Sequence, residues 1–338
     1  MRILQTSSVA GKARRTAAVL ALLLLAAALF SLCLGASGIS LWAGLWDALR
    51  GVDSAPARVL LHIRLPRTLA AMLAGAALSC AGVMIQGVLG NPLAGPNVIG
   101  VNAGAGLTTL LLATLAPSAV AFLPAAAFAG ALGASLLILL LADRMGASRM
   151  TVVLAGVAIS SMLGAGSDLL TTLNPEATLG MSSFLIGGFS GLTAARLRSA
   201  AWYVLPALAV AHLMAGDLDI LGLGDEVAAS LGMRVRRTRV LQLVVASVLA
   251  GGAVSFAGLL GFVGLIVPHA MRRVVGGEHR RLMPVSMLGG ALLTTVCDLL
   301  ARTLFAPYEI PVGILLSLMG GPFFLWLLMR RGRKGARG

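Results

Sequence analysis

Long runs of apolar residues recur along the chain, separated by short stretches rich in Arg, Gly, Pro and Asn. A helix needs about 20 predominantly apolar residues to cross a bilayer. Ten runs approach this length, and each is predicted to be a membrane span. The predicted spans are residues 16–36, 65–86, 96–116, 118–142, 150–170, 199–216, 238–257, 260–274, 284–305 and 312–330. The pattern therefore predicts one all-α, polytopic membrane domain over residues 1–338, with no soluble domain.

The basic residues give this arrangement a direction. With the N-terminus inside and the spans alternating, 19 of the 26 Lys and Arg residues fall inside and 7 outside. Cytoplasmic loops carry such an excess, so both termini are predicted to be cytoplasmic (N-in, C-in). The first run follows Lys12, Arg14 and Arg15, as in a signal peptide. At about 20 residues it is long for a signal sequence and fits a span.

Composition supports a membrane protein over a soluble one. The chain is 58% hydrophobic and 11% charged, with a mean hydropathy of +0.96, whereas soluble domains carry about 25% charged residues. A net charge of +14 would suit a nucleic-acid binder, but the arginines lie between apolar runs, so no nucleic acid is predicted as a partner. The sequence contains no GxxxxGK[ST] phosphate loop. Any drive by ATP must come from a partner, and the chain itself is not predicted to be an enzyme.

Ionisable residues are rare in the middle of the predicted spans. Asp168, Asp298, His212 and His269 lie toward span ends. A proton- or sodium-coupled carrier would normally place carboxylates at mid-depth, which disfavours a secondary carrier. The scattered histidines also disfavour a polytopic membrane enzyme, and neither a metal nor a cofactor is predicted.

Three arginines depart from the charge rule because they lie at outside ends of spans. Arg64 and Arg67 open the second span, and Arg302 lies near the end of the ninth. They can anchor helices at lipid headgroups. Alternatively, they form a docking site for an acidic partner, since the guanidinium fork pairs with carboxylates. The residues alone leave both interpretations open.

The segment between the second and third spans, residues 86–97, is rich in Gly, Asn and Pro. Irregular backbone at membrane depth is tolerated only inside protein or beside water. Asn91, Pro92 and Asn97 are therefore expected to lie beside a translocation pathway or among the helices. A tight cytoplasmic turn is the alternative.

A second inside segment, residues 223–233, has the pattern of a short helix. Acidic residues occupy its first turn and Gly232 suits its C-terminal cap. Val227, Ala228 and Leu231 are expected to form a small apolar face. Such a helix could rest on the membrane surface or insert into a partner.

These segments resemble the iron-chelate/cobalamin permease family of bacterial ABC importers, the FecCD type. The resemblance covers almost the whole chain and rests on six blocks in order. The blocks are RLPR at 64–67, GNPLAGPNVIGVNAGAG at 90–106, LGDEVAASLG at 223–232, GLLGFVGLIVPHAMRRVVGGEHRRLMP at 258–284, CDLLAR at 297–302 and EIPVGILLSLMGGPFFLWLL at 309–328.

The resemblance implies a type II ABC importer permease with ten helices. It implies pairing with a second copy or a paralogue, two cytosolic P-loop ATPase subunits, and a periplasmic or lipid-anchored binding protein. The binding protein would dock on Arg64, Arg67 and Arg302. The ATPases would receive a coupling helix that comprises Gly224, Asp225, Glu226, Ala228, Leu231 and Gly232.

The resemblance also implies a cytoplasmic gate where the fourth and fifth spans meet, around Ser148, Arg149 and Thr151. The residues GVNAGAG at 100–106, which follow the Gly/Asn/Pro-rich turn, are most similar to those of siderophore permeases. The expected cargo is therefore a ferric siderophore. Haem and cobalamin are the alternatives within the family. The expected location is the bacterial inner (cytoplasmic) membrane.

Overall fold

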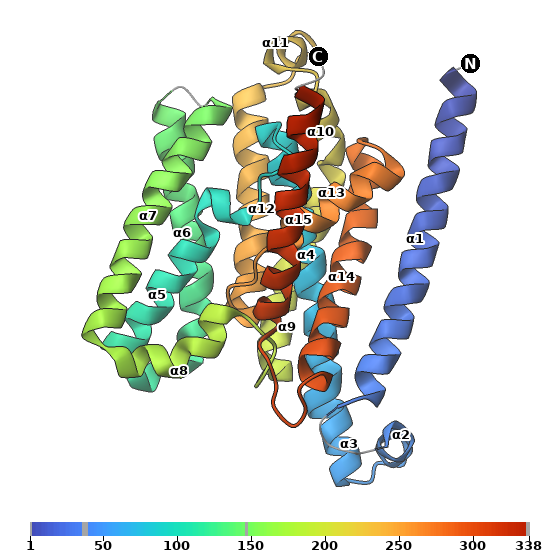
Figure 1. The fold of residues 1–338 in the computed structure, drawn as a ribbon, viewed down its shortest axis with the longest axis vertical. Helices are drawn as coiled ribbons and strands as arrows, with labels where there is room; N and C mark the ends of the chain where they lie inside the picture. The colour runs from blue at the N-terminus through green and yellow to red at the C-terminus, as the bar shows by residue number, and fades with distance from the viewer. Residues whose placement is uncertain (1, 36–39, 146–147, 336–338) are drawn as a thin grey trace.

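The computed structural model describes residues 2–35, 40–145 and 148–335, and over these residues it is helical without strands (Figure 1). Each predicted span overlaps one helix of a bundle. The ten helices are α1 (Arg2–Cys33), α4 (Leu65–Leu89), α5 (Val101–Leu115), α6 (Leu123–Arg144), α7 (Arg149–Leu173), α9 (Ala194–Leu213), α12 (Val235–Ala257), α13 (Val263–Val275), α14 (His279–Thr303) and α15 (Val312–Gly335). Residue 36, the end of the first predicted span, lies outside the described residues.

Among the described residues, six helices can span a membrane by length and composition alone. A seventh span would join α9 to the short α10 (Ala215–Leu221) across a 47° bend. α5 and the apolar part of α15, Val312–Leu327, are shorter apolar helices. α13, with 13 residues, is shorter still. These helices complete the predicted set of about ten.

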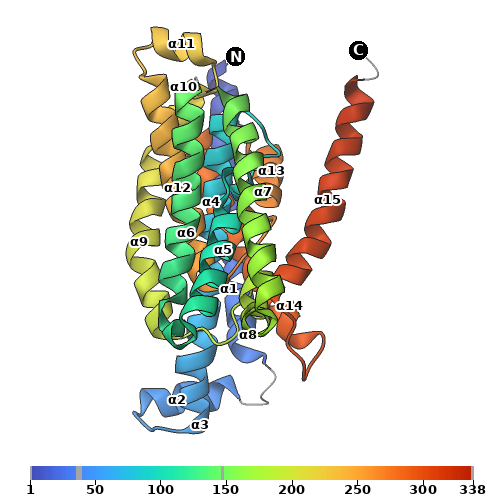
Figure 2. The same ribbon diagram turned by 90° about the vertical axis from the view of Figure 1, so that its left-hand side faces the viewer.

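The remaining helices mark the two ends of the bundle. α11 (Asp225–Ser230) lies at the end where both described chain ends are found, as N-in/C-in topology requires (Figures 1 and 2). The opposite end carries α2 (Leu41–Leu49), α3 (Ala55–Val59) and α8 (Pro175–Ile186). By the charge rule, the α11 end is cytoplasmic and the α8 end is outside.

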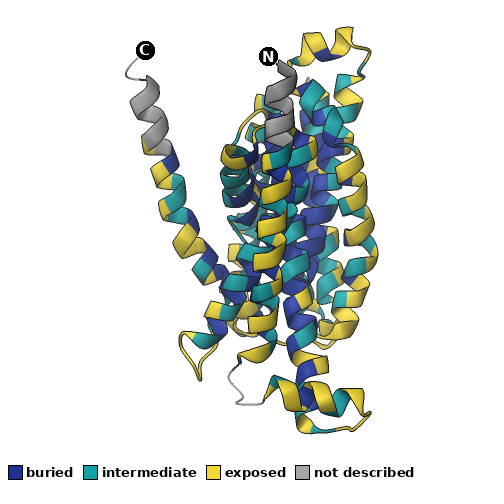
Figure 3. Cartoon of the chain, turned by 90° about the vertical axis from the view of Figure 1, so that its right-hand side faces the viewer, coloured by how far each residue is buried: buried dark blue, intermediate teal, exposed yellow. Residues whose placement is uncertain are grey.

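The core is centred on α4. In its membrane-spanning window 78% of the residues are buried, compared with 72% in α12, 61% in α14 and 11% in α7. Small residues permit this close packing. Gly75 of α4 lies so close to Gly290 of α14 that a Cβ on either would overlap the other's carbonyl oxygen. α1 and α15 lie at the edges of the bundle, and exposed residues run along much of their length (Figure 3).

Two parts of the fold differ from the prediction. The third span begins at Val101 rather than at residue 96, because residues 96–99 form a separate 3-10 turn that ends at Gly100, with φ +74°. The outside segment 172–198, which the prediction left between the fifth and sixth spans without an element of its own, contains α8. The end of α8 is fixed by backbone contacts: the Leu259 amide donates to the Phe184 carbonyl (3.0 Å), and the Gly313 amide donates to the Gly187 carbonyl (3.0 Å).

Candidate coupling and docking sites

α11 projects from the cytoplasmic end of the bundle. It occupies residues 225–230 of the predicted 223–233 segment, and glycines with positive φ flank it: Gly224 (+103°) and Gly232 (+84°). Only glycine adopts such backbone readily. Leu231 and Val227 are 63% and 47% exposed. Ala228 is fully buried, so the exposed part of the predicted apolar face consists of Val227 and Leu231.

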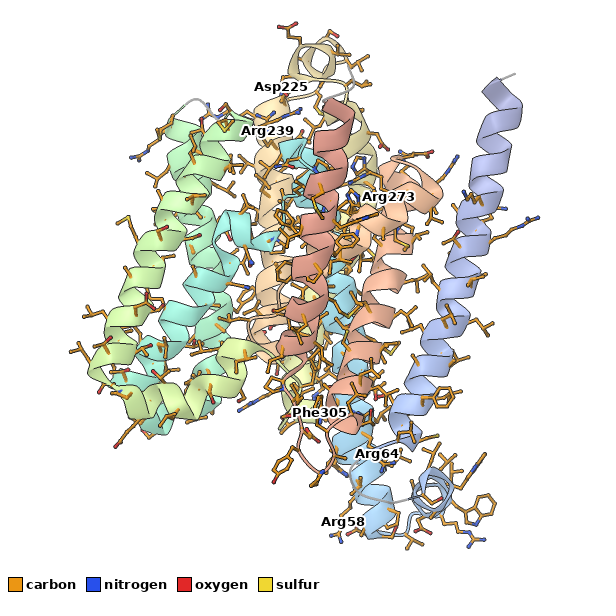
Figure 4. The ribbon with its side chains drawn as sticks, in the orientation of Figure 1. Arg58, Arg64, Asp225, Arg239, Arg273 and Phe305 are labelled. Carbon is orange, nitrogen blue, oxygen red and sulfur yellow. The ribbon has the colours of Figure 1, made fainter. Side chains whose placement is uncertain are left out.

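The two acids of α11 have different surroundings. Both are exposed, but Asp225 turns back toward the bundle, as Figure 4 shows beside Arg239 of α12. Arg239 Nη2 donates to both oxygens of the Asp225 carboxylate, at 2.8 and 2.9 Å. Arg149 Nη2 lies 3.6 Å from the same carboxylate and donates to the Leu221 carbonyl at 3.3 Å. Asp225 thus links the short helix to the start of α7 and to α12.

Arg149 also contacts the irregular segment after α4. Gly90 has a left-handed conformation (φ +60°), and the Arg149 guanidinium occupies the space where its Cβ would lie. The structure therefore brings together the 90–97 segment, the start of α7 and α11. Sequence reasoning named residues in all three segments but did not predict that Asp225 and Arg149 would meet.

The other predicted gate residues have local contacts. Ser148 caps α7, since its Oγ accepts from the Thr151 amide at 3.1 Å and lies 2.7 Å from Thr151 Oγ1. Asn91 Oδ1 accepts from the Leu93 amide at 3.0 Å, which shapes the turn that also contains Pro92. Asn97 is exposed and lines a cavity of about 320 Å³ with Pro96, Phe262, Gly264 and Phe324 among others. The hydrogen bonds and ion pairs of the described residues connect Asp225 to Arg149 and Arg239 but not to Ser148, Asn91 or Asn97.

The outer end of the bundle contains a buried ionic cluster. Asp298 of α14 is fully buried. Arg67 Nε donates to its two oxygens at 3.0 and 3.2 Å, and Arg302 Nε lies 3.7 Å from Oδ2. Arg67 Nη1 donates to Glu309 at 2.8 Å, and Ser190 Oγ donates to the same oxygen at 3.0 Å.

The remaining contacts of the cluster hold α1 in place. Arg64 Nη1 donates to the carbonyls of Leu32 and Cys33, at 2.8 and 3.1 Å. A cation suits this position because the last carbonyls of a helix lack internal partners. Arg302 Nη2 donates to Ser31 Oγ at 2.6 Å. The cluster thus joins α1, α4, α14 and the segment before α15.

Glu309, in the segment between α14 and α15, remains charged in this cluster. Its partial burial alone would raise its pKa. The hydrogen bonds from Arg67 and Ser190, together with the positive charges of Arg67 and Arg302, outweigh that effect and lower the pKa of Glu309 below its usual value. The carboxylate is therefore ionised at neutral pH.

The three arginines predicted to dock a binding protein are mostly enclosed. Arg64, Arg67 and Arg302 are 4%, 7% and 4% exposed. Sequence reasoning missed the two acids that pair with Arg67. The one available signal was the four-residue spacing of Asp298 and Arg302, which suits an ion pair on a helix. Docking at these arginines stays a prediction. The exposed arginines at this end are Arg50, Arg58, Arg196 and Arg198.

No group of three or more His, Cys, Asp or Glu residues suited to a metal ion occurs in the described part of the chain.

The chain is thus a many-helix membrane bundle whose short cytoplasmic helix is tied to the interior by ion pairs. Residues 23–330 match the model of the FecCD transport family, and the chain belongs to this family. It is 38% identical over 318 residues to the hemin transport system permease protein HmuU of Yersinia pestis, covering 92% of this chain and 94% of that protein. It is 41% identical over 273 residues to the Fe(3+) dicitrate transport system permease protein FecD of Escherichia coli K12. That alignment covers 80% of this chain and 85% of FecD.

The fold is also similar to a solved structure of an inward-facing ABC transporter of the metal-chelate type. The match has a TM-score of 0.82 and 29% sequence identity, and it covers 94% of this chain and 99% of that chain. The chain is therefore a multi-pass permease of the ABC importers that carry iron chelates, haem or cobalamin.

Proposed function

We propose that this chain is the membrane-spanning subunit through which a ferric siderophore crosses the bacterial inner membrane, driven by ATP hydrolysis in separate subunits. The observation that carries the proposal is α11, an exposed cytoplasmic helix whose Asp225 pairs with Arg149 and Arg239. A partner that pushes on α11 would act directly on α7 and α12. Two cytosolic P-loop ATPase subunits are the proposed partners, because the chain lacks a phosphate loop of its own.

A second permease, a copy of this chain or a paralogue, is proposed to complete the pathway along α7. In this chain only 11% of the membrane-spanning window of α7 is buried. Large apolar side chains are exposed along its length, among them Met150, Leu154, Val157 and Met162, which are 60–70% exposed. α7 begins at Arg149, so the helix least covered by its own chain is also the one linked to α11.

A periplasmic or lipid-anchored binding protein is proposed to deliver the cargo at the outer end. The exposed Arg58, Arg196 and Arg198 give this end a positive surface for acidic residues of such a partner. Arg64, Arg67 and Arg302 would contribute through the positive field of the cluster beneath it. ATP binding would then close the ATPases, move α11 and bias the permease toward one of its two states.

Haem is the second candidate cargo, because the alignment with the hemin permease HmuU covers 92% of this chain at 38% identity. Uptake by iron-starved cells with and without this gene separates the candidates. The three probes are a radio-iron siderophore, labelled haem and labelled cobalamin. Loss of siderophore uptake alone is expected. Loss of haem or cobalamin uptake instead would preserve the permease assignment and overturn the proposed cargo.

A further inference from the structure

Arginines gather at the cytoplasmic ends of α6 and α12 in a place that the transport mechanism does not use. α6 and α12 pack against each other, and Figure 2 shows them side by side, with α15 on the other side of the molecule. Arg144 of α6 and Arg234, Arg236 and Arg237 around the start of α12 are all exposed. Arg239 belongs to another set, because its side chain is buried and pairs with Asp225.

A hollow lies among these arginines. Its volume is about 460 Å³, and it is lined by Asp143, Arg236, Arg237, Val240 and Leu241. Among the described residues of this lining, Asp143 is the only acid, and it pairs with Arg236 through two hydrogen bonds. Asp143 is paired with Arg236, whereas Arg237 in the lining and the nearby Arg144 and Arg234 add positive charge, so the surroundings of the hollow carry a net positive charge.

The floor of the hollow continues as an apolar surface toward the middle of the membrane. On α6, Leu140 and Leu136 lie one and two turns below Asp143 on the same face and are 63% and 37% exposed. On α12, Leu241 is 56% exposed, and Val244 lies one turn below Val240 on the same face. Positive charge at the interface above exposed hydrocarbon is complementary to one ligand class, an anionic phospholipid.

We propose that the hollow between the cytoplasmic ends of α6 and α12 binds an anionic phospholipid, with its phosphate at Arg237 and Arg144 and its acyl chains along Leu140 and Leu241. The guanidinium group pairs with phosphate through parallel hydrogen bonds. The cytoplasmic leaflet supplies anionic lipids at this depth. Leu140 and Leu241 below the hollow are 63% and 56% exposed, so lipid can reach this surface of the chain.

Native mass spectrometry of the purified full chain tests this proposal. Phosphatidylglycerol is titrated against phosphatidylcholine as the zwitterionic comparator. The unchanged protein should retain phosphatidylglycerol selectively, and Arg144→Gln with Arg237→Gln should reduce its retention about tenfold. Both side chains are exposed, so the fold should persist. The matched control is Arg14→Gln with Arg15→Gln, which removes two exposed cytoplasmic charges from α1 and should leave retention unchanged.

A second variant predicts a change in the opposite direction. Asp143→Asn removes the acid that pairs with Arg236 and should increase phosphatidylglycerol retention. Equal loss in the Arg14/Arg15 control would show a general charge effect and overturn the site. Displacement of the lipid by excess inorganic phosphate at constant ionic strength would assign the site to free phosphate. If the Arg144→Gln/Arg237→Gln variant lost a co-purifying ATPase but retained lipid normally, the surface would be assigned to a protein partner. Assignment to free phosphate or to a protein would overturn the proposal.

Discussion

Replacing Asp298 by Asn should destabilise the protein by about 3–5 kcal/mol, the usual cost of breaking a buried ion pair by removing one partner. Asp298 is fully buried. Its carboxylate is the shared partner of Arg67 (3.0 Å) and Arg302 (3.7 Å). An uncharged side chain would leave two enclosed guanidinium groups without that negative charge. Thermal unfolding of the detergent-purified protein, followed by size-exclusion chromatography, measures the effect as a lower Tm.

Asp53→Asn is the matched control for this prediction. Asp53 also pairs with an arginine at the outer end, Arg58 at 3.5 Å, but its side chain is 78% exposed. An exposed pair contributes about 0–1 kcal/mol, so this variant should unfold close to the unchanged protein. If Asp298→Asn unfolded at the same temperature as Asp53→Asn, the cluster would not hold the outer ends of the helices together.

Asp225→Asn should reduce ATP-driven uptake about tenfold while the ATPase subunits still co-purify. Asp225 accepts from Arg239 at 2.8 Å and lies 3.6 Å from Arg149. Without its charge, α11 can still contact a partner but transmits less of its movement to α7 and α12. A tenfold loss corresponds to about 1.4 kcal/mol, within the usual range of coupling free energies. Uptake into cells and ATPase co-purification are measured in parallel.

Two further variants separate coupling from assembly. Leu231→Glu changes the exposed apolar side of α11 and should prevent co-purification of the ATPase. Asp217→Asn makes the same substitution on the neighbouring α10. Asp217 is not a partner of Arg149 or Arg239 in the ion pairs described, so uptake and ATPase co-purification should both be unchanged. Normal uptake by Asp225→Asn would refute the proposed role of this carboxylate.

The features that the sequence predicted are those encoded by neighbouring residues. Ten apolar runs specify ten helices because a lipid environment leaves the backbone few alternatives. The acids of the first turn and Gly232 specify α11 through local backbone preferences. The position of α5 was harder to predict because Gly100 separates a 3-10 turn from the helix. α8, with 12 residues, is too short to stand out as a span.

The features that the sequence did not predict depend on residues far apart in the chain. Asp298 and Glu309 lie 231 and 242 positions from Arg67, so only the folded bundle brings them together. The sequence therefore did not identify either acid as a partner of Arg67. The sequence likewise placed Ala228 on an apolar face with Val227 and Leu231, but only the fold shows that Ala228 is fully buried while the other two are exposed.

Transport into right-side-out membrane vesicles tests the central claim most directly. The vesicles come from cells that lack this gene and its relatives and that carry the partner subunits with this chain or an empty vector. They are loaded with ATP or with a non-hydrolysable analogue, and a radio-iron siderophore with its binding protein is added outside. The account predicts uptake only when both this chain and hydrolysable ATP are present. Uptake that needs the chain but follows a proton gradient without ATP would contradict it and identify a secondary carrier.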